Sequence, residues 1–237
     1  MRGDDGADLA LLTDAALAAG EIAKLHFGRN PEVWEKADNG GPVSEADLAI
    51  DRMLGAELTS ARPDYGWLSE ETEDGAGRLA AERVFIVDPI DGTRAFVAGK
   101  PSFSHALAVV EAGQVTAAVV HLPIPGLTFA ATRGGGATVN GAPILPSARE
   151  GLSGAAVLTH DWQLKAKNWP GGVPDVVAHQ RSSLAYRLCL IANGEFDAMI
   201  TLRNAWEWDV AAGALIVAEA GGMVTDRNGG APVFNNP

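Results

Sequence analysis

The sequence predicts an α+β protein in which helices pack on a mostly antiparallel sheet. Two observations carry this prediction. Between residues 103 and 132, apolar segments of strand length follow one another across short turns, as in an antiparallel meander. Towards both ends of the chain, alanine- and leucine-rich segments have the spacing of helices. Of the 237 residues, 47% are hydrophobic and 20% charged, so the chain can bury a core of ordinary size.

The first half of the chain combines two helices with several strands. One helix is expected over residues 8–27, where Gly28 closes it, and another over residues 44–61, which stops before Pro63. The strands expected here cover residues 33–36, 67–70, 84–88, 103–110, 115–122 and 127–132. A glycine-rich hairpin follows over residues 134–143.

The second half of the chain is expected to alternate strands and helices. Helices are predicted over residues 161–167, 182–192 and 206–220, and glycines follow the last two. Strands are predicted over residues 155–158, 196–202 and 223–225. Residues 234–237 are expected to be loose.

Charge and cysteine content limit the classes of partner. A net charge of −12 and a pI near 4.8 argue against duplex nucleic acid or an anionic membrane as partner, because both need a basic face. The single Cys189 rules out an internal disulfide and fits a reducing cytoplasm as a buried structural thiol. Residues 1–5 lack the basic start of a secretory signal, and no apolar run reaches the ~18 residues of a membrane span. We therefore expect a cytoplasmic protein.

The segment Val87-Asp88-Pro89-Ile90-Asp91-Gly92-Thr93 is the most informative in the chain. Two carboxylates follow a buried apolar strand three residues apart, where they repel each other by roughly 4 kcal/mol at an effective dielectric near 20. A cation between them would remove that repulsion, and the free N–H groups of Gly92 and Thr93 could hold an anion beside it. Ordinary Asp-Pro and Asp-Gly turns remain an alternative. The spacing does not fit an EF-hand or an aspartyl-phosphate enzyme.

Three further acidic residues lie at the ends of predicted elements. Glu70 follows a strand in Trp67-Leu68-Ser69-Glu70-Glu71-Thr72, and taken alone it fits a solvated acidic loop. Asp209 lies in Trp208-Asp209-Val210-Ala211-Ala212-Gly213, where an interaction with the helix dipole is the simpler interpretation. Asp47 follows Ser44 by three residues, a spacing typical of a capping box.

Together, these motifs resemble the inositol monophosphatase superfamily of metal-dependent, lithium-sensitive phosphatases. They occur in that superfamily's order and spacing over roughly residues 15–226. The resemblance implies a layered α/β/α/β/α sandwich that forms one compact unit. Residues 1–145 would form a first half carrying most metal ligands. Residues 146–237 would form a second half carrying Asp209 and the residues on the substrate side, with the active site between the halves.

The resemblance also implies roles for individual residues. Two or three Mg²⁺ ions, replaceable by Mn²⁺, would be held by Glu70, Asp88, the Ile90 carbonyl, Asp91 and Asp209. Glu70 and the pair Thr93 and Asp47 would orient the attacking water, and the amides of Gly92 and Thr93 would bind phosphate oxygens. Hydrolysis would be direct, without a phosphoenzyme. Lys36 matches a position near the site, although an exposed lysine explains it equally well.

The substrate is less constrained than the reaction. Inositol-specific relatives have a glutamate where this chain has Leu202. The segments Asp91-Gly92-Thr93-Arg94-Ala95-Phe96 and Ser182-Ser183-Leu184 look more like bacterial 3′(2′),5′-bisphosphate nucleotidases. Adenosine 3′(2′),5′-bisphosphate is therefore the preferred substrate, with Arg94 and Ser183 as contacts. Arg94, Arg181 and Arg203 are candidates for binding a second phosphate, although each could equally be a surface arginine.

Other interpretations stay open at this stage. Inositol 1-phosphate and histidinol phosphate are alternative substrates, and a catalytically weak regulatory protein on the same fold is a different class. In the preferred interpretation the partner is a small phosphorylated metabolite. A homodimer is expected from the resemblance alone.

Overall fold

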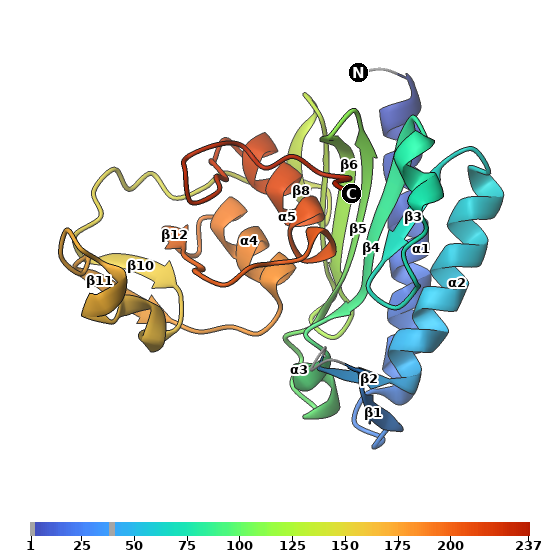
Figure 1. Ribbon diagram of the computed structural model, residues 1–237, viewed down its shortest axis with the longest axis horizontal. Helices are drawn as coiled ribbons and strands as arrows, with labels where there is room; N and C mark the ends of the chain where they lie inside the picture. Colours follow the sequence, from blue (N-terminus) through green and yellow to red (C-terminus); the bar gives the residue numbers. More distant parts are fainter. Residues whose placement is uncertain (1–2, 38–40) are drawn as a thin grey trace.

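The computed structural model describes residues 3–37 and 41–237. Met1 and Arg2, the start of the segment in which no secretory signal is expected, lie outside this description, as do residues 38–40. The predicted layered α+β fold is confirmed (Figure 1): two helices cover one face of a large sheet, two others cover its opposite face, and a small sheet lies beyond them. No helix within the described ranges is both long and apolar enough to cross a membrane.

The large sheet has seven strands in the order β3-β4-β5-β6-β7-β8-β9. Only β3 and β4 run parallel, and every other neighbouring pair is antiparallel. This confirms the meander expected from residue 103 onwards. The strands are β3 (Gly66–Ser69), β4 (Arg83–Asp91), β5 (Ser104–Glu111), β6 (Gln114–Leu122), β7 (Leu127–Thr132), β8 (Gly136–Val139) and β9 (Ala142–Pro143).

Helices α1 (Gly3–His26) and α2 (Glu45–Ala61) cover one face of this sheet (Figure 1). Their apolar residues meet those of β4, β5 and β6 in one buried cluster, which includes Leu54, Phe85 and Leu107. The short strands β1 (Val33–Glu35) and β2 (Pro42–Ser44) form a separate antiparallel pair that leads into α2. Helix α2 begins directly after β2, and β2 lies against α3 (Thr93–Val97), the short helix that follows β4. The first turn of α2 is therefore close to the end of β4.

Helices α4 (Leu184–Ala192) and α5 (Glu207–Glu219) cover the other face. Their apolar residues form a second core cluster with the sheet, and Cys189 is fully buried in it, as predicted. The two helices approach closely at Gly213, where an added Cβ would lie 2.6 Å from the Cβ of Leu188. This close approach brings the first turns of α4 and α5 together at the end of β4.

The second half of the chain differs from the prediction in detail. Its small sheet is parallel, in the order β11-β10-β12, with strands β10 (Ala155–Leu158), β11 (Val176–His179) and β12 (Ala198–Met199). The sequence analysis missed β11 and made β12 too long. Two 3-10 turns, η3 (Asp161–Leu164) and η4 (Ala166–Asn168), replace the expected helix, and residues 223–225 form no strand.

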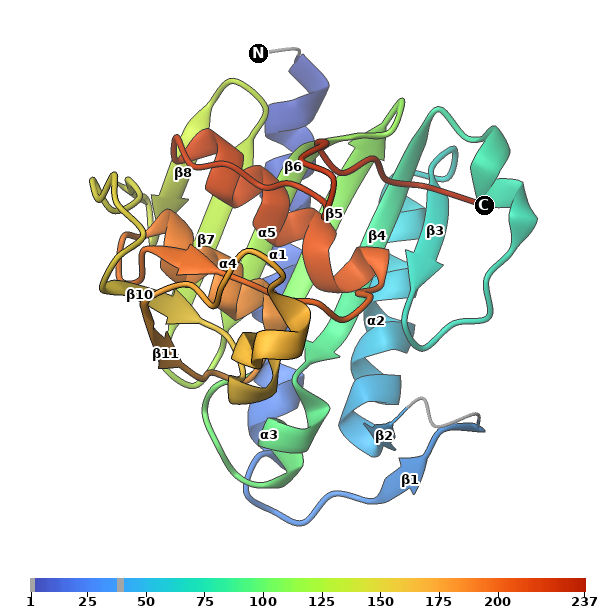
Figure 2. The same cartoon turned by 60° about the vertical axis from the view of Figure 1, so that its left-hand side comes forward.

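The C-terminal segment is held in place, contrary to the expectation that it would be loose. Arg78, in the 3-10 helix η2 (Ala76–Ala80), donates to Asn235 Oδ1 at 2.5 Å and to the Asn236 carbonyl at 2.9 Å. Glu207, at the start of α5, accepts from the backbone N–H groups of both asparagines. Figure 2 shows this segment crossing to the loop that follows β3. Because these contacts link segments distant in sequence, the local pattern could not predict them.

Candidate active site

The site is built around the end of β4, a strand buried along its whole length. Its pairing with β5 shifts between Asp88 and Asp91, so the backbone bulges where the two carboxylates lie. Gly92 then adopts a left-handed conformation with φ of 98°. A Cβ at this position would lie 3.4 Å from the Ser183 nitrogen, an ordinary van der Waals distance, so it is the left-handed turn that requires glycine.

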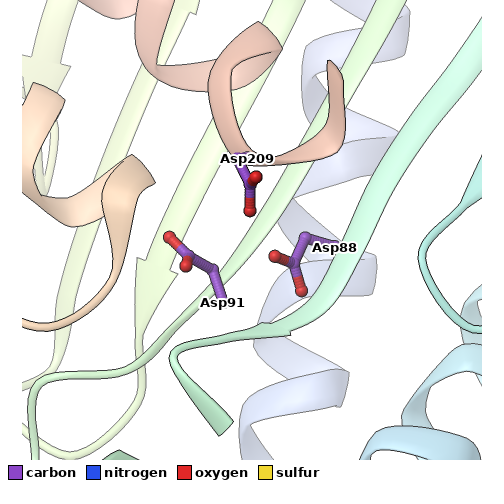
Figure 3. A group of neighbouring side chains, drawn as sticks. All are labelled: Asp88, Asp91 and Asp209. Carbon is purple, nitrogen blue, oxygen red and sulfur yellow. The ribbon is translucent and has the colours of Figure 1, made fainter. Parts of the chain in front are cut away.

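Three of the predicted metal ligands converge at this bulge. Oxygen atoms of Asp88, Asp91 and Asp209 all lie within 4.8 Å of one another (Figure 3). Asp209 reaches the cluster from the first turn of α5, where its Oδ2 accepts from the Trp206 N–H at 3.0 Å. The capping interpretation and the metal interpretation of Asp209 are therefore compatible, since the capping bond uses only one of its two oxygens.

Burial and mutual repulsion disfavour the charged forms of these acids. The pKa of Asp88 lies well above its usual range, first because of burial and then because of the charges of Glu70, Asp91 and Asp209. Burial and the charge of Asp91 raise the pKa of Asp209 to about 7. The pKa of Asp91 is also raised by burial, although bonds from Ser183 and Ala185 oppose the shift.

The cluster fits a divalent cation. Both side-chain oxygens of Asp88 are buried, and neither has a hydrogen-bond partner among the described residues. Buried carboxylate oxygens without donors are costly in a folded protein unless a cation or water satisfies them. An all-oxygen set of this kind suits Mg²⁺ or Mn²⁺ better than softer metals.

Without metal, the stability of the protein is expected to fall as pH rises from about 4 to 7. Asp209 has a pKa of about 7 in the folded state, against about 3.9 when unfolded, so the folded state binds more protons in this window. The stabilising contribution of the protonated carboxyl is present at low pH and is lost as pH rises through 7. Thermal melts in chelator should show a smaller decline for Asp209→Asn than for wild type. Equal declines would contradict this assignment.

Glu70 lies at the edge of the same site, where its carboxylate forms an ion pair with Lys36. Lys36 Nζ is 2.6 Å from Glu70 Oε1 and 2.7 Å from Glu71 Oε1. Burial lowers the pKa of Lys36, but bonds to these two carboxylates outweigh it and the net shift is upward. Burial raises the pKa of Glu71 to about 7. Of the two interpretations of Lys36, the structure supports the one that places it near the site.

Thr93 and Asp47 form the predicted pair. The Thr93 hydroxyl lies 3.0 Å from Asp47 Oδ1 and 3.1 Å from the Ile90 carbonyl oxygen. Asp47 also belongs to the capping box of α2, whose N-cap is Ser44. Its Oδ2 accepts from the Ser44 N–H at 2.9 Å and from the Ser44 hydroxyl at 2.5 Å. Burial raises the pKa of Asp47 despite these bonds. One carboxylate thus joins the start of α2 to the turn after β4.

Ser183 lies beside the acidic cluster, in contact with Asp91. Its hydroxyl lies 2.7 Å from Asp91 Oδ2 and 2.9 Å from the Ser104 hydroxyl, and it accepts from the Tyr186 N–H as the cap of α4. The Ala185 N–H donates to the same Asp91 oxygen at 2.6 Å. Ser183 therefore orients Asp91, while its direct contact with a substrate stays a prediction.

A cavity of about 440 Å³ is lined by the acidic cluster, Glu70, Ile90, Gly92 and Thr93. Its walls also carry four arginines, Arg94, Arg181, Arg187 and Arg203. The sequence analysis singled out all of them except Arg187. Arg187 lies one helical turn after Ser183 and donates to its carbonyl at 3.2 Å. In the sequence, this i,i+4 spacing was the signal that could have indicated Arg187 as a site residue, because it places Arg187 and Ser183 on one side of α4.

Comparison with known proteins assigns the family. The profile of the Inositol monophosphatase family matches residues 7–237. The chain belongs to this family. It is 35% identical to the inositol-1-monophosphatase of Rhizobium meliloti, over 94% of this chain and 86% of that protein. It is also 35% identical to the fructose-1,6-bisphosphatase/inositol-1-monophosphatase of Thermotoga maritima, over 89% of this chain and 81% of that protein.

Solved structures agree with this assignment. The extragenic suppressor protein suhB from Bartonella henselae has a TM-score of 0.81 and 33% identity, over 94% of this chain and 89% of that chain. As a member of the inositol monophosphatase family, the protein is a phosphatase acting on a small phosphate ester. The family is metal-dependent, in agreement with the acidic cluster at the end of β4.

Proposed function

We propose that the protein is a Mg²⁺-dependent phosphomonoesterase whose substrate carries a second anionic group, and that this substrate is adenosine 3′(2′),5′-bisphosphate. One observation carries the proposal: four arginines line the same cavity as the acidic cluster. A guanidinium group forms paired hydrogen bonds with phosphate oxygens, so this wall suits a polyanion.

The charges of the cavity favour two phosphate groups over one. Two Mg²⁺ ions would balance the four carboxylates that line the cavity, Glu70, Asp88, Asp91 and Asp209. The four guanidinium charges would then face the substrate. Each phosphate ester group carries about two negative charges at neutral pH, so a bisphosphate neutralises this wall and a monophosphate leaves half of it unpaired.

Two of the arginines are oriented by aromatic rings before any substrate binds. The guanidinium carbon of Arg203 lies 5.3 Å from the ring centre of Trp162, and that of Arg181 lies 5.3 Å from the ring centre of Phe196. A side chain that is already ordered loses less conformational entropy when it binds an anion. The arrangement therefore favours Arg181 and Arg203 as contacts of the second phosphate.

The remaining residues have roles in direct hydrolysis. Bound Mg²⁺ would supply an acidified water and neutralise charge on the ester. Glu70 and the Thr93 hydroxyl would hold that water in line with phosphorus, with Asp47 fixing the hydroxyl. The N–H groups of Gly92 and Thr93 would bind phosphate oxygens at the turn after β4.

Inositol 1-phosphate is the main alternative, because several relatives are named as inositol-1-monophosphatases. Leu202 argues against it, since an apolar side chain cannot accept a hydrogen bond from an inositol hydroxyl. The backbone of Leu202 is held by Gln163 and Arg227 instead, and the residue is not among those that line the cavity.

Phosphate release in the presence of Mg²⁺ tests the proposal. The panel is adenosine 3′,5′-bisphosphate, myo-inositol 1-phosphate, histidinol phosphate and fructose 1,6-bisphosphate. We expect the highest kcat/KM for the nucleotide. A higher value for inositol 1-phosphate would overturn the substrate but not the class. No release from any ester by metal-loaded protein would favour a regulatory role.

Replacing Arg203 with glutamine should separate the two phosphate sites. We expect kcat/KM for adenosine 3′,5′-bisphosphate to fall by about tenfold, the size of one lost charged hydrogen bond. The rate for adenosine 3′-monophosphate, which lacks the second phosphate, should change little. Arg52→Gln on the exposed side of α2 is the control, with the same loss of charge away from the cavity. Equal losses for both substrates would contradict the assignment of Arg203.

A further inference from the structure

His105 is a fully buried histidine on β5, opposite the bulge in β4. The strand pairing matches Asp88 with Ala106 and Asp91 with Ser104, so only His105 faces the two residues Pro89 and Ile90. Two residues opposite one is the arrangement of a β-bulge, in which the regular ladder of hydrogen bonds is interrupted. The backbone of the bulge therefore needs partners from outside the ladder.

The imidazole of His105 supplies such a partner. Its Nδ1 lies 2.5 Å from the carbonyl oxygen of Pro89. A carbonyl oxygen can only accept, so Nδ1 carries the hydrogen and donates it. Pro89 itself has no N–H to offer to the ladder, which leaves this bond as a principal anchor of the segment between the two metal ligands.

The surroundings of the imidazole ring indicate that His105 has a structural role and does not act on a substrate. Burial lowers the pKa of His105 to about 3, so the ring is neutral at physiological pH. Its Nε2 is buried without a partner among the described residues, and His105 is absent from the residues that line the cavity. A role as metal ligand or proton donor is therefore not supported.

Other rings hold the imidazole in place. His121 stacks on it with ring centres 6.1 Å apart, and Phe103 meets it edge-on at 6.1 Å. His121 is fixed in turn by a 2.9 Å hydrogen bond to the Thr128 hydroxyl. It also lies against α1 at Gly20, where an added Cβ would be 2.8 Å from His121 Nε2. The imidazole of His105 therefore has little freedom to rotate, and its Nδ1–H stays directed at the Pro89 carbonyl.

We propose that His105 is a positioning residue that fixes the Pro89 carbonyl and thereby holds Asp88 and Asp91 in the geometry that binds metal. The inference rests on the metal site of the proposed function. Asp88 and Asp91 immediately flank the bulge, so a rotation of the Pro89 peptide changes the distance between their carboxylates. Residues that orient metal ligands typically contribute about 10- to 100-fold to metal affinity.

The test compares three full-length variants by their affinity for Mn²⁺, measured by calorimetric titration and by the shift in melting temperature. His105→Leu removes the donor and should weaken Mn²⁺ binding about tenfold or more. His105→Asn keeps an N–H donor near the position of Nδ1 and should bind nearly as tightly as wild type. Val109→Ala, in the same strand and core cluster, is the packing control and should lower the melting temperature without weakening Mn²⁺ binding.

The outcomes separate this inference from the proposed function. If His105→Leu and wild type bind Mn²⁺ equally, the role of His105 is overturned while the metal site stands. If His105→Asn binds as weakly as His105→Leu, the hydrogen-bond explanation is overturned. If wild type binds no Mn²⁺, the metal site and with it the proposed function fall. Should His105→Leu not fold, His105→Val takes its place, since a β-branched side chain suits a strand.

Discussion

Replacing Asp88 with asparagine is expected to abolish stabilisation by Mg²⁺ and to lower phosphatase activity by about a thousandfold or more. The loss corresponds to the several kcal/mol that a bound metal contributes to a reaction of this class. Of the three acids, Asp88 gives the clearest test of metal binding, because both of its oxygens are buried without a hydrogen-bond partner in the described part of the chain. One of its oxygens lies within 4.8 Å of oxygens of both Asp91 and Asp209, so a metal bound by this cluster is expected to use Asp88.

The same substitution should raise the melting temperature of the metal-free protein. In wild type, burial and four neighbouring acids disfavour the charged form of Asp88. An amide of nearly the same shape removes that charge and can donate to the remaining carboxylates. The order of the two melting temperatures should therefore reverse between the two conditions: the variant is more stable in chelator, and wild type is more stable in Mg²⁺.

Glu73→Gln is the matched control for this experiment. It removes one acidic charge from the exposed loop after Glu70 without touching the cluster, so both melting curves should resemble those of wild type. If Asp88→Asn keeps the full stabilisation by Mg²⁺, the acidic cluster is not the metal site. A variant less stable than wild type in chelator would instead contradict the electrostatic account of the cluster.

The places of the three clustered acidic residues in the fold could be predicted from the sequence because each has a local signal, whereas their shared metal role came from the family resemblance. Asp88 and Asp91 follow an apolar run that reads as a buried strand, and Asp209 opens a helix with a small-residue face. These patterns depend on neighbours in sequence, so they fix the element and the position within it. The structure places all three carboxylates together.

Other features depend on contacts between distant segments and could not be predicted in this way. The contact of His105 with Pro89 exists only because a bulge puts one residue of β5 opposite two of β4. Arg187 has a local signal only in its spacing of four residues from Ser183, and the docking of α4 decides that it lies on the cavity wall. The strand β11 has four residues at the edge of a parallel sheet, too few to show a period.

Glu70 shows a limit of a different kind. The family resemblance implies that it is a metal ligand, and the structure places it on the cavity wall, paired with Lys36. A lysine beside a carboxylate competes with a cation for the same oxygens. The metal role of Glu70 therefore stays a prediction, whereas its position at the site is established.

Replacing Thr93 with valine is expected to lower kcat by about a hundredfold, at the lower end of what a group that orients the attacking water contributes. The valine has the same shape but no hydroxyl, so Asp47 Oδ1 loses its partner at 3.0 Å. Mn²⁺ affinity should change much less than kcat, because neither Thr93 nor Asp47 belongs to the acidic cluster. Steady-state kinetics together with Mn²⁺ titration measure the two effects separately.

Two companion variants identify the hydroxyl as the group responsible. Thr93→Ser keeps the hydroxyl and should retain most of the activity. Asp47→Asn keeps the shape but presents an N–H donor, so the Thr93 hydroxyl must accept from it instead of donating to it. This turns the hydroxyl and leaves only one of its two lone pairs for water, in a changed direction. That variant should therefore be as slow as Thr93→Val, although its Ser44 cap is also weakened and its melting temperature falls. Full activity in Thr93→Val would show that the water is oriented by other groups, leaving Asp47 with its role in the capping box of α2.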